Sequence, residues 1–119
     1  MTFDWTSGAL AEGLRLYDSG QYFEAHEEWE TVWLTAVEPE RTFLQALIQV
    51  TAAMEHLRRN DNRLGASRLL TAALGRLEPC PRHFGGLDVD LLRTDIREGL
   101  AALAASATPP PPRIRPLSL

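Results

Sequence analysis

The segment Tyr22-Phe23-Glu24-Ala25-His26-Glu27-Glu28-Trp29-Glu30-Thr31-Val32-Trp33 places one imidazole, four carboxylates and four aromatic rings within about three turns of a predicted helix. Charged groups and large apolar surfaces must therefore lie on neighbouring faces of this helix. The segment carries more chemically versatile side chains than any other part of the chain. We expect the remaining helices to pack around it.

Apolar residues at helical spacing predict four more helices. The third predicted helix is apolar around most of its circumference, so we expect it to be the central, most buried one. Glycine, proline, Asn and Asp mark the predicted ends, because these residues favour helix caps and turns. The predicted helices are residues 6–18, 21–37, about 39–59, a fourth between the turn at 60–62 and Pro79, and a fifth from Asp88 or Asp90 to about Ala107.

These helices predict an all-α fold, a compact bundle of about five helices built from two packed helical hairpins plus a C-terminal helix. Residues 1–107 form a single helical domain, and residues 108–119 form a proline-rich extended tail. Residues 79–86, dense in proline and glycine, are predicted to be a loop. The tail is either a disordered extension or a strut that docks on an aromatic groove of the same or another protomer.

Composition and charge exclude several classes of protein. A net charge of -4 without a basic cluster argues against nucleic acid as a partner. No apolar run approaches the roughly 20 residues of a membrane span, and no signal peptide is visible, so we expect a cytoplasmic protein that does not bind membranes. The single cysteine, Cys80, has no partner for an internal disulfide or a thiolate metal cluster.

Several linked motifs lie along the chain and can be compared with known families. They are Gly20-x-Tyr22-Phe23-x-Ala25-His26-Glu27-x-x-Glu30-x-x-Trp33, then Arg41-x-Phe43-Leu44-Gln45-x-Leu47-Ile48-Gln49, then Asn62-x-x-Gly65-Ala66-x-x-Leu69-Leu70, with Pro79-Cys80-Pro81 and Gly86-Leu87-Asp88 further on. Together they resemble the domain-of-unknown-function family 309. The resemblance covers roughly residues 10–100 and implies a small, cytoplasmic, all-α bundle with no established activity.

One interpretation of the polar residues in 22–33 is a metal site. His26-Glu27-x-x-Glu30 is an HExxE motif, which is similar to the HExxH motif of zinc proteases with a carboxylate in place of the second histidine. His26 and Glu30 are then the metal ligands, His56 is a candidate third ligand, and Glu27 is the candidate catalytic base. This alternative predicts a metal-dependent, hydrolase-like enzyme that binds a divalent cation.

The other interpretation is a buried polar network in which Arg41 and Gln45 satisfy Glu27 and Glu30, and His26 bonds a carboxylate or a carbonyl. Loss of Arg41 would then cost roughly 3–5 kcal/mol, because it would leave a buried charge unpaired. A third possibility is a ligand pocket or partner groove in which Trp29 and Tyr22 are exposed anchors. The residues predicted for this network or binding site are Tyr22, His26, Glu27, Glu30, Trp33, Arg41, Gln45 and Gln49.

The leading functional hypothesis is a non-enzymatic protein-interaction or structural module that contains this polar network. It rests on the predicted pairing of helices into hairpins, on the large number of aromatic residues and on the incomplete set of catalytic residues. It predicts a protein partner or self-association as a homo-oligomer, and no cofactor. The metal-dependent enzyme is the alternative.

Overall fold

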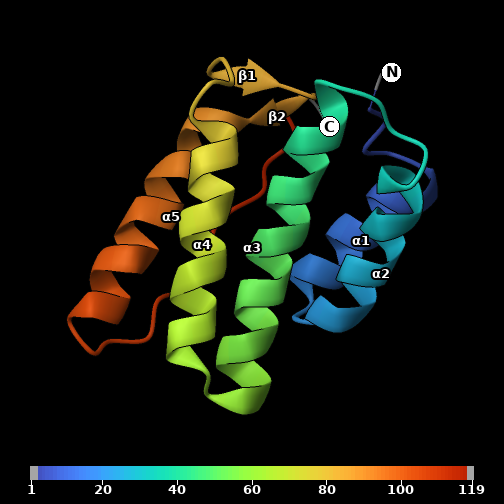
Figure 1. The fold of residues 1–119 in the computed structure, drawn as a ribbon. Coiled ribbons are helices and arrows are strands. Elements are labelled where there is room, and N and C mark those ends of the chain that lie inside the picture. Colours follow the sequence, from blue (N-terminus) through green and yellow to red (C-terminus); the bar gives the residue numbers. More distant parts are fainter. Residues whose placement is uncertain (1–2, 118–119) are drawn as a thin grey trace.

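The computed structural model describes residues 3–117, which fold into five helices and one short two-stranded sheet (Figure 1). The predicted all-α bundle is confirmed. Between residues 3 and 117, no helix combines the length and the hydropathy that crossing a membrane requires. The elements are α1 (Gly8–Asp18), α2 (Tyr22–Trp33), α3 (Glu40–Asn60), α4 (Arg63–Leu77), β1 (His83–Phe84), β2 (Leu87–Asp88) and α5 (Val89–Ala104).

The helices pack as two hairpins, α1 with α2 and α3 with α4, and α5 lies along the outer side of α4 (Figure 1). Helix α3 contacts both α2 and α4, so it is the central helix, as predicted. Its apolar residues recur around most of its circumference, and packing on two sides buries them. The buried side chains of α3 are Phe43, Leu44, Ala46, Leu47, Ile48, Val50, Thr51, Ala53 and Met54.

Helix ends follow the local capping chemistry. Asn62 caps α4 by accepting a hydrogen bond from the backbone N–H of Gly65 at 2.9 Å, and Asp88 caps α5 in the same way through Leu91 at 3.0 Å. Helix α2 ends at Trp33, four residues earlier than predicted from the sequence, because the chain turns at residues 34–35 and again at 38–39 before α3 begins. This connection separates the last turn of α2 from the first turn of α3.

The segment predicted to be a loop contains an antiparallel hairpin, β1–β2, at residues 83–88. Gly85 and Gly86 form its turn with φ of 60° and 75°, values that non-glycine residues rarely adopt. A Cβ atom at Gly85 would lie only 2.7 Å from the Phe3 ring and 2.9 Å from the Phe43 ring. The hairpin therefore packs its turn against the N-terminal segment and the start of α3.

The proline-rich segment 108–117 folds back across its own domain to the hairpin (Figure 1). The buried Tyr17 hydroxyl donates to the carbonyl of Pro112 at 2.6 Å, and Arg113 pairs with Asp95 of α5 at 2.9 Å. Ile114 is buried, and the backbone N–H of Leu117 bonds the carbonyl of Gly86. The segment 108–117 therefore lies against its own domain, with Tyr17 among the residues that bond it, and the last two residues of the predicted tail, 118–119, lie outside the described part of the chain.

Candidate functional site

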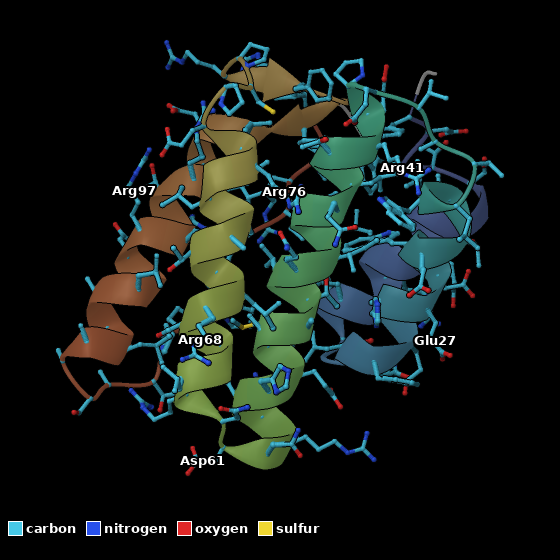
Figure 2. The ribbon with its side chains drawn as sticks, viewed as in Figure 1. Glu27, Arg41, Asp61, Arg68, Arg76 and Arg97 are labelled. Atoms are coloured by element: carbon cyan, nitrogen blue, oxygen red, sulfur yellow. The ribbon has the colours of Figure 1, made fainter. Side chains whose placement is uncertain are left out.

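The HExxE residues lie on the solvent side of α2. His26 Nε2 and Glu30 Oε2 are 2.9 Å apart, and their side chains are 31% and 50% exposed. Glu27 is also exposed, on the outer side of the bundle (Figure 2). The prediction that these residues are buried is therefore wrong for Glu27 and Glu30, and His26 is only partly covered.

The predicted metal ligands do not come together. Within residues 3–117, no three His, Cys, Asp or Glu side chains are close enough to hold a metal ion. His56 instead lies near the end of α3, where its Nδ1 is 3.3 Å from the side-chain nitrogen of Asn62. The set of His26, Glu30 and His56 is thus wrong as a ligand set, and within residues 3–117 Glu27 does not lie beside any other such set.

The aromatic residues Tyr22 and Trp29 are core residues, not the exposed anchors that one prediction made them. Trp29 is 0% exposed and donates its indole N–H to the carbonyl of Leu10 at 3.1 Å. Tyr22 is 3% exposed and packs edge-to-face on Tyr17. With Ala25, these two residues form the face of α2 that is buried against its neighbours. His26 and Glu30 each follow a buried residue by one position, so they lie on an adjacent face of the helix.

Arg41 does not pair with Glu27 or Glu30. Its guanidinium lies over the Trp33 ring, 3.9 Å from the ring centroid, and donates to the carbonyl of Ala36 at 3.3 Å. In Figure 2, Arg41 lies near the upper end of the bundle, whereas Glu27 lies lower, on the outer side of α2. The buried His/Glu/Arg network is therefore wrong, and a cost of roughly 3–5 kcal/mol for losing Arg41 no longer follows from it.

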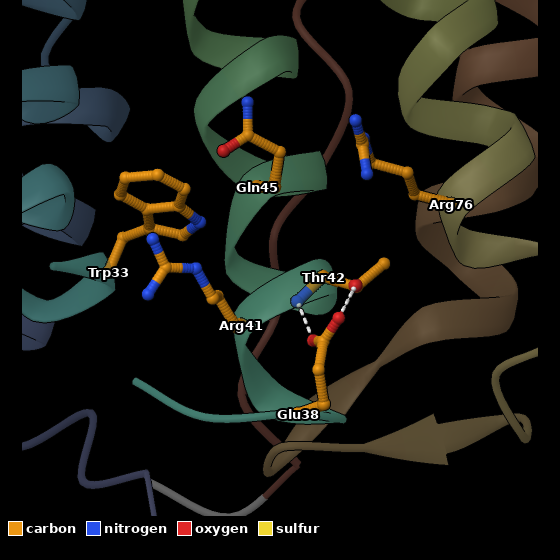
Figure 3. Close-up of a pocket in the computed structure, with 6 residues that line it drawn as sticks. All are labelled: Trp33, Glu38, Arg41, Thr42, Gln45 and Arg76. Carbon is orange, nitrogen blue, oxygen red and sulfur yellow. Dashed lines mark hydrogen bonds between the residues drawn. The ribbon is translucent and has the colours of Figure 1, made fainter. Parts of the chain in front are cut away.

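Three of the predicted site residues, Trp33, Arg41 and Gln45, do come together, in a groove that also involves α4 (Figure 3). The groove has a volume of about 340 Å³. Arg41 and Trp33 lie on one side of it and Arg76 on the other, with Gln45 between them (Figure 3). We call this hollow the arginine groove; its lining residues are Trp33, Glu38, Arg41, Thr42, Gln45 and Arg76.

The two arginines of the groove have no carboxylate partner within 4 Å among residues 3–117. Arg76 donates through Nε to the side-chain oxygen of Gln49 at 3.2 Å, so this predicted residue holds a groove arginine in place. Among residues 3–117, Glu38 is the only carboxylate that lines the groove. Two guanidinium groups against one carboxylate leave one positive charge in excess, in a protein whose net charge is -4.

Glu38 is engaged by the start of α3. Its carboxylate accepts hydrogen bonds from the hydroxyl of Thr42 at 2.6 Å and from the backbone N–H of Thr42 at 2.7 Å. These bonds lower the pKa of Glu38, and the nearby charges of Arg41 and Arg76 lower it further. Glu38 is therefore ionised at neutral pH and is a weak proton acceptor.

A second hollow of about 380 Å³ adjoins the arginine groove and shares Glu38, Thr42 and Arg76 with it. We call it the apolar hollow. Burial raises the pKa of the Cys80 thiol, so this side chain is an uncharged, protonated part of the wall. The residues that complete the lining are Pro39, Phe43, Pro79, Cys80, Pro81 and Phe84.

Comparison with known protein families shows which family this chain matches. The family model described as "Domain of unknown function (DUF309)" matches residues 10–69, half of the sequence. The chain belongs to the DUF309 family. The matched segment contains five of the six residues that line the arginine groove of this DUF309 domain, and Arg76 lies beyond it.

A solved structure supports the assignment to DUF309. A conserved hypothetical protein from Thermus thermophilus has a similar fold, with a TM-score of 0.67 and 38% sequence identity. The similarity covers 86% of this chain and all of that one. No curated protein matches the sequence. The family and the fold of this DUF309 domain are thus shown, whereas its activity has to be inferred from the groove.

Sequence reasoning missed Arg76, Glu38 and Thr42. Arg76 lies in the last turn of α4, where arginine commonly interacts with the helix dipole, so its position carried no distinguishing signal. Glu38 precedes α3 and Thr42 lies in its first turn, and their spacing of four residues resembles an ordinary helix start. Only the packing of α4 against α3 brings these residues to one hollow.

Proposed function

We propose that this DUF309 domain is a non-enzymatic binding module and that its arginine groove binds a negatively charged group of the ligand. The observation that carries the proposal is the pair Arg41 and Arg76, which lie on opposite sides of the groove without a carboxylate partner among residues 3–117 (Figure 3). Six other arginines form ion pairs within residues 3–117. Guanidinium groups recognise carboxylates and phosphates through paired N–H donors.

Both arginines are held in place before any ligand binds. The Trp33 ring and the Ala36 carbonyl position Arg41, and the Gln49 side chain positions Arg76. Each guanidinium has five N–H donors, so most of them are left for a ligand. Preorganised side chains lose less conformational entropy on binding, which favours affinity.

The chemistry of the lining supports binding over catalysis. A general base works best with a pKa near neutrality, whereas the pKa of Glu38 is lowered by Thr42. A cysteine nucleophile needs a lowered pKa, whereas burial raises that of Cys80. The remaining lining residues of the arginine groove are an indole, two guanidiniums, an amide and a hydroxyl, which are groups typical of recognition.

The proposal is tested by an NMR titration of the isotope-labelled protein with sodium phosphate and sodium acetate at constant ionic strength. We expect saturable shifts of the Nε–H signals of Arg41 and Arg76 and of the Trp33 indole N–H. The buried indoles of Trp5 and Trp29 serve as internal references and should not shift.

The double variant Arg41→Gln/Arg76→Gln should lose these shifts. Arg68→Gln is the matched control, because Arg68 is an exposed arginine of the same helix as Arg76 but lies further down α4 and does not line the groove (Figure 2). Equal shifts with sodium chloride alone, or unchanged shifts of the Trp33 indole in the double variant, would contradict the proposal.

A further inference from the structure

We infer that the ligand is an extended segment of a partner protein that places one Asp or Glu carboxylate between Arg41 and Arg76 and an apolar side chain in the neighbouring apolar hollow. This inference rests on the proposed function and goes further, because it names the chemistry of the partner.

The two hollows form one continuous surface of mixed character. They share Glu38, Thr42 and Arg76, so a ligand in one meets the wall of the other. The arginine groove offers charge and hydrogen-bond donors, whereas three prolines and two phenylalanines line the apolar hollow. A ligand that fills both must therefore carry an anionic group and an apolar group a short distance apart.

The charge of the arginine groove fits a single carboxylate. Arg41 and Arg76 exceed Glu38 by one positive charge. Glu38 keeps its negative charge, since Thr42 lowers its pKa. A group with two negative charges, such as a phosphate, would leave one negative charge in excess beside Glu38, whereas one carboxylate neutralises the groove, so a carboxylate should bind more tightly than a phosphate.

The exposure of the walls favours a polypeptide over a small molecule. Pro79, Pro81, Glu38 and Arg76 are exposed residues, so the hollows are open on the solvent side. Small-molecule sites bury most of the ligand surface, which an open groove does not do. An extended chain instead gains contacts along its length, and its backbone amides can bond the side-chain amide of Gln45 and the carboxylate of Glu38.

The experiment measures the binding of three fluorescent synthetic peptides to the full chain by anisotropy. The peptides share one polar sequence and differ at two positions, which carry Glu and Phe, Glu and Ser, or Gln and Phe. Each is made with one, two or three residues between the positions. We expect the Glu/Phe peptide at its best spacing to bind roughly tenfold or more tightly than either of the others.

Protein variants assign each preference to its hollow. Arg41→Gln/Arg76→Gln should remove the preference for Glu over Gln, and Phe84→Ala should remove the preference for Phe over Ser. Phe84 packs on the Phe43 ring at 4.9 Å between centroids, so its variant is used only if its melting curve matches the parent. Otherwise Pro81→Ser, at an exposed position of the same wall, replaces it. Arg68→Gln is again the control and should bind like the parent.

The outcomes separate the inference from the proposed function. If acetate shifts the groove signals but Glu/Phe and Glu/Ser peptides bind equally, the inference is overturned and the anion site stands. If sodium hexanoate binds as tightly as the Glu/Phe peptide, a small amphipathic carboxylate is the ligand and the partner segment is overturned. If Glu/Phe binding persists unchanged in the double arginine variant, the proposed function fails as well.

Discussion

The substitution Gly13→Ala would place a methyl group where the indole of Trp29 already lies. A Cβ atom built on Gly13 would be 2.1 Å from Trp29 Nε1 and 2.4 Å from Cδ1, far closer than real Cβ contacts. The indole has no room to retreat, because it is fully buried, bonded to the Leu10 carbonyl and packed against Tyr17. Gly13 is therefore the position that lets α1 and α2 approach each other.

Two opposing effects set the magnitude. Alanine in place of glycine inside a helix favours folding by up to about 1 kcal/mol. Overpacking a rigid core costs about 1–3 kcal/mol, and displacing the indole also weakens its hydrogen bond, worth about 1 kcal/mol. We expect the clash to win, so that Gly13→Ala lowers the free energy of unfolding by about 2 kcal/mol.

The measurement is urea-induced unfolding followed by circular dichroism. Gly75→Ala is the matched control, because Gly75 lies in α4 where an added Cβ would meet no atom of residues 3–117 within 4 Å, and it should stabilise the protein by up to about 1 kcal/mol. Adding Trp29→Val to Gly13→Ala removes the clashing ring atoms and should give a favourable coupling energy of about 1–2 kcal/mol. The reasoning is refuted if Gly13→Ala is as stable as Gly75→Ala.

Three further predictions concern contacts that close the fold. Arg93, 7% exposed, donates to the carbonyl of Leu77 at the end of α4 and to that of Cys80 just beyond it. Arg93→Met should therefore lower the free energy of unfolding in urea by about 2–4 kcal/mol, and a loss below about 1 kcal/mol would contradict this role. Tyr17→Phe removes the hydrogen bond to the C-terminal segment and should lower the free energy of unfolding by about 1–2 kcal/mol. It should also speed amide hydrogen exchange in residues 108–117, and unchanged exchange would contradict the role of Tyr17 in holding this segment. Hydrogen bonds from Arg113 lower the pKa of Asp95 below its unfolded value near 3.8. The pair therefore stabilises the fold above about pH 4, and this stabilisation is lost as the pH falls through the lowered pKa. Between about pH 5 and pH 2 the melting temperature should fall less steeply in Asp95→Asn than in the parent, and parallel curves would refute this role of Asp95.

The helices were predictable because each one buries a single face. The apolar spacing along residues 43–57 predicts a helix covered on two sides, and α3 packs against both α2 and α4. The caps at Asn62 and Asp88 were predictable too, since an Asn or Asp side chain bonds a backbone N–H three residues ahead of it in the chain. Both are local effects that the order of residues encodes directly.

The hairpin was not predicted, and the surface on which the C-terminal segment lies was left open. The strands at 83–84 and 87–88 are too short to show an alternating pattern, and only Gly85-Gly86 hints at the turn between them. The segment 108–117 is held by single contacts from distant residues, such as the Tyr17 hydroxyl and the Asp95 carboxylate. No local pattern in a proline-rich segment indicates which surface of the domain it will cover.

For the candidate site, the sequence by itself determined which side chains share a face of one helix. It grouped His26 with Glu30 and made α2 the carrier of aromatic and charged residues. The tertiary structure decided which helices contact each other and which of their turns lie side by side. Arg41 lies against Trp33 instead of Glu27, and Arg76 of α4 lines the same groove. The physical reason is that helical periodicity fixes directions around one axis, whereas the alignment of one helix along another depends on how the whole core packs.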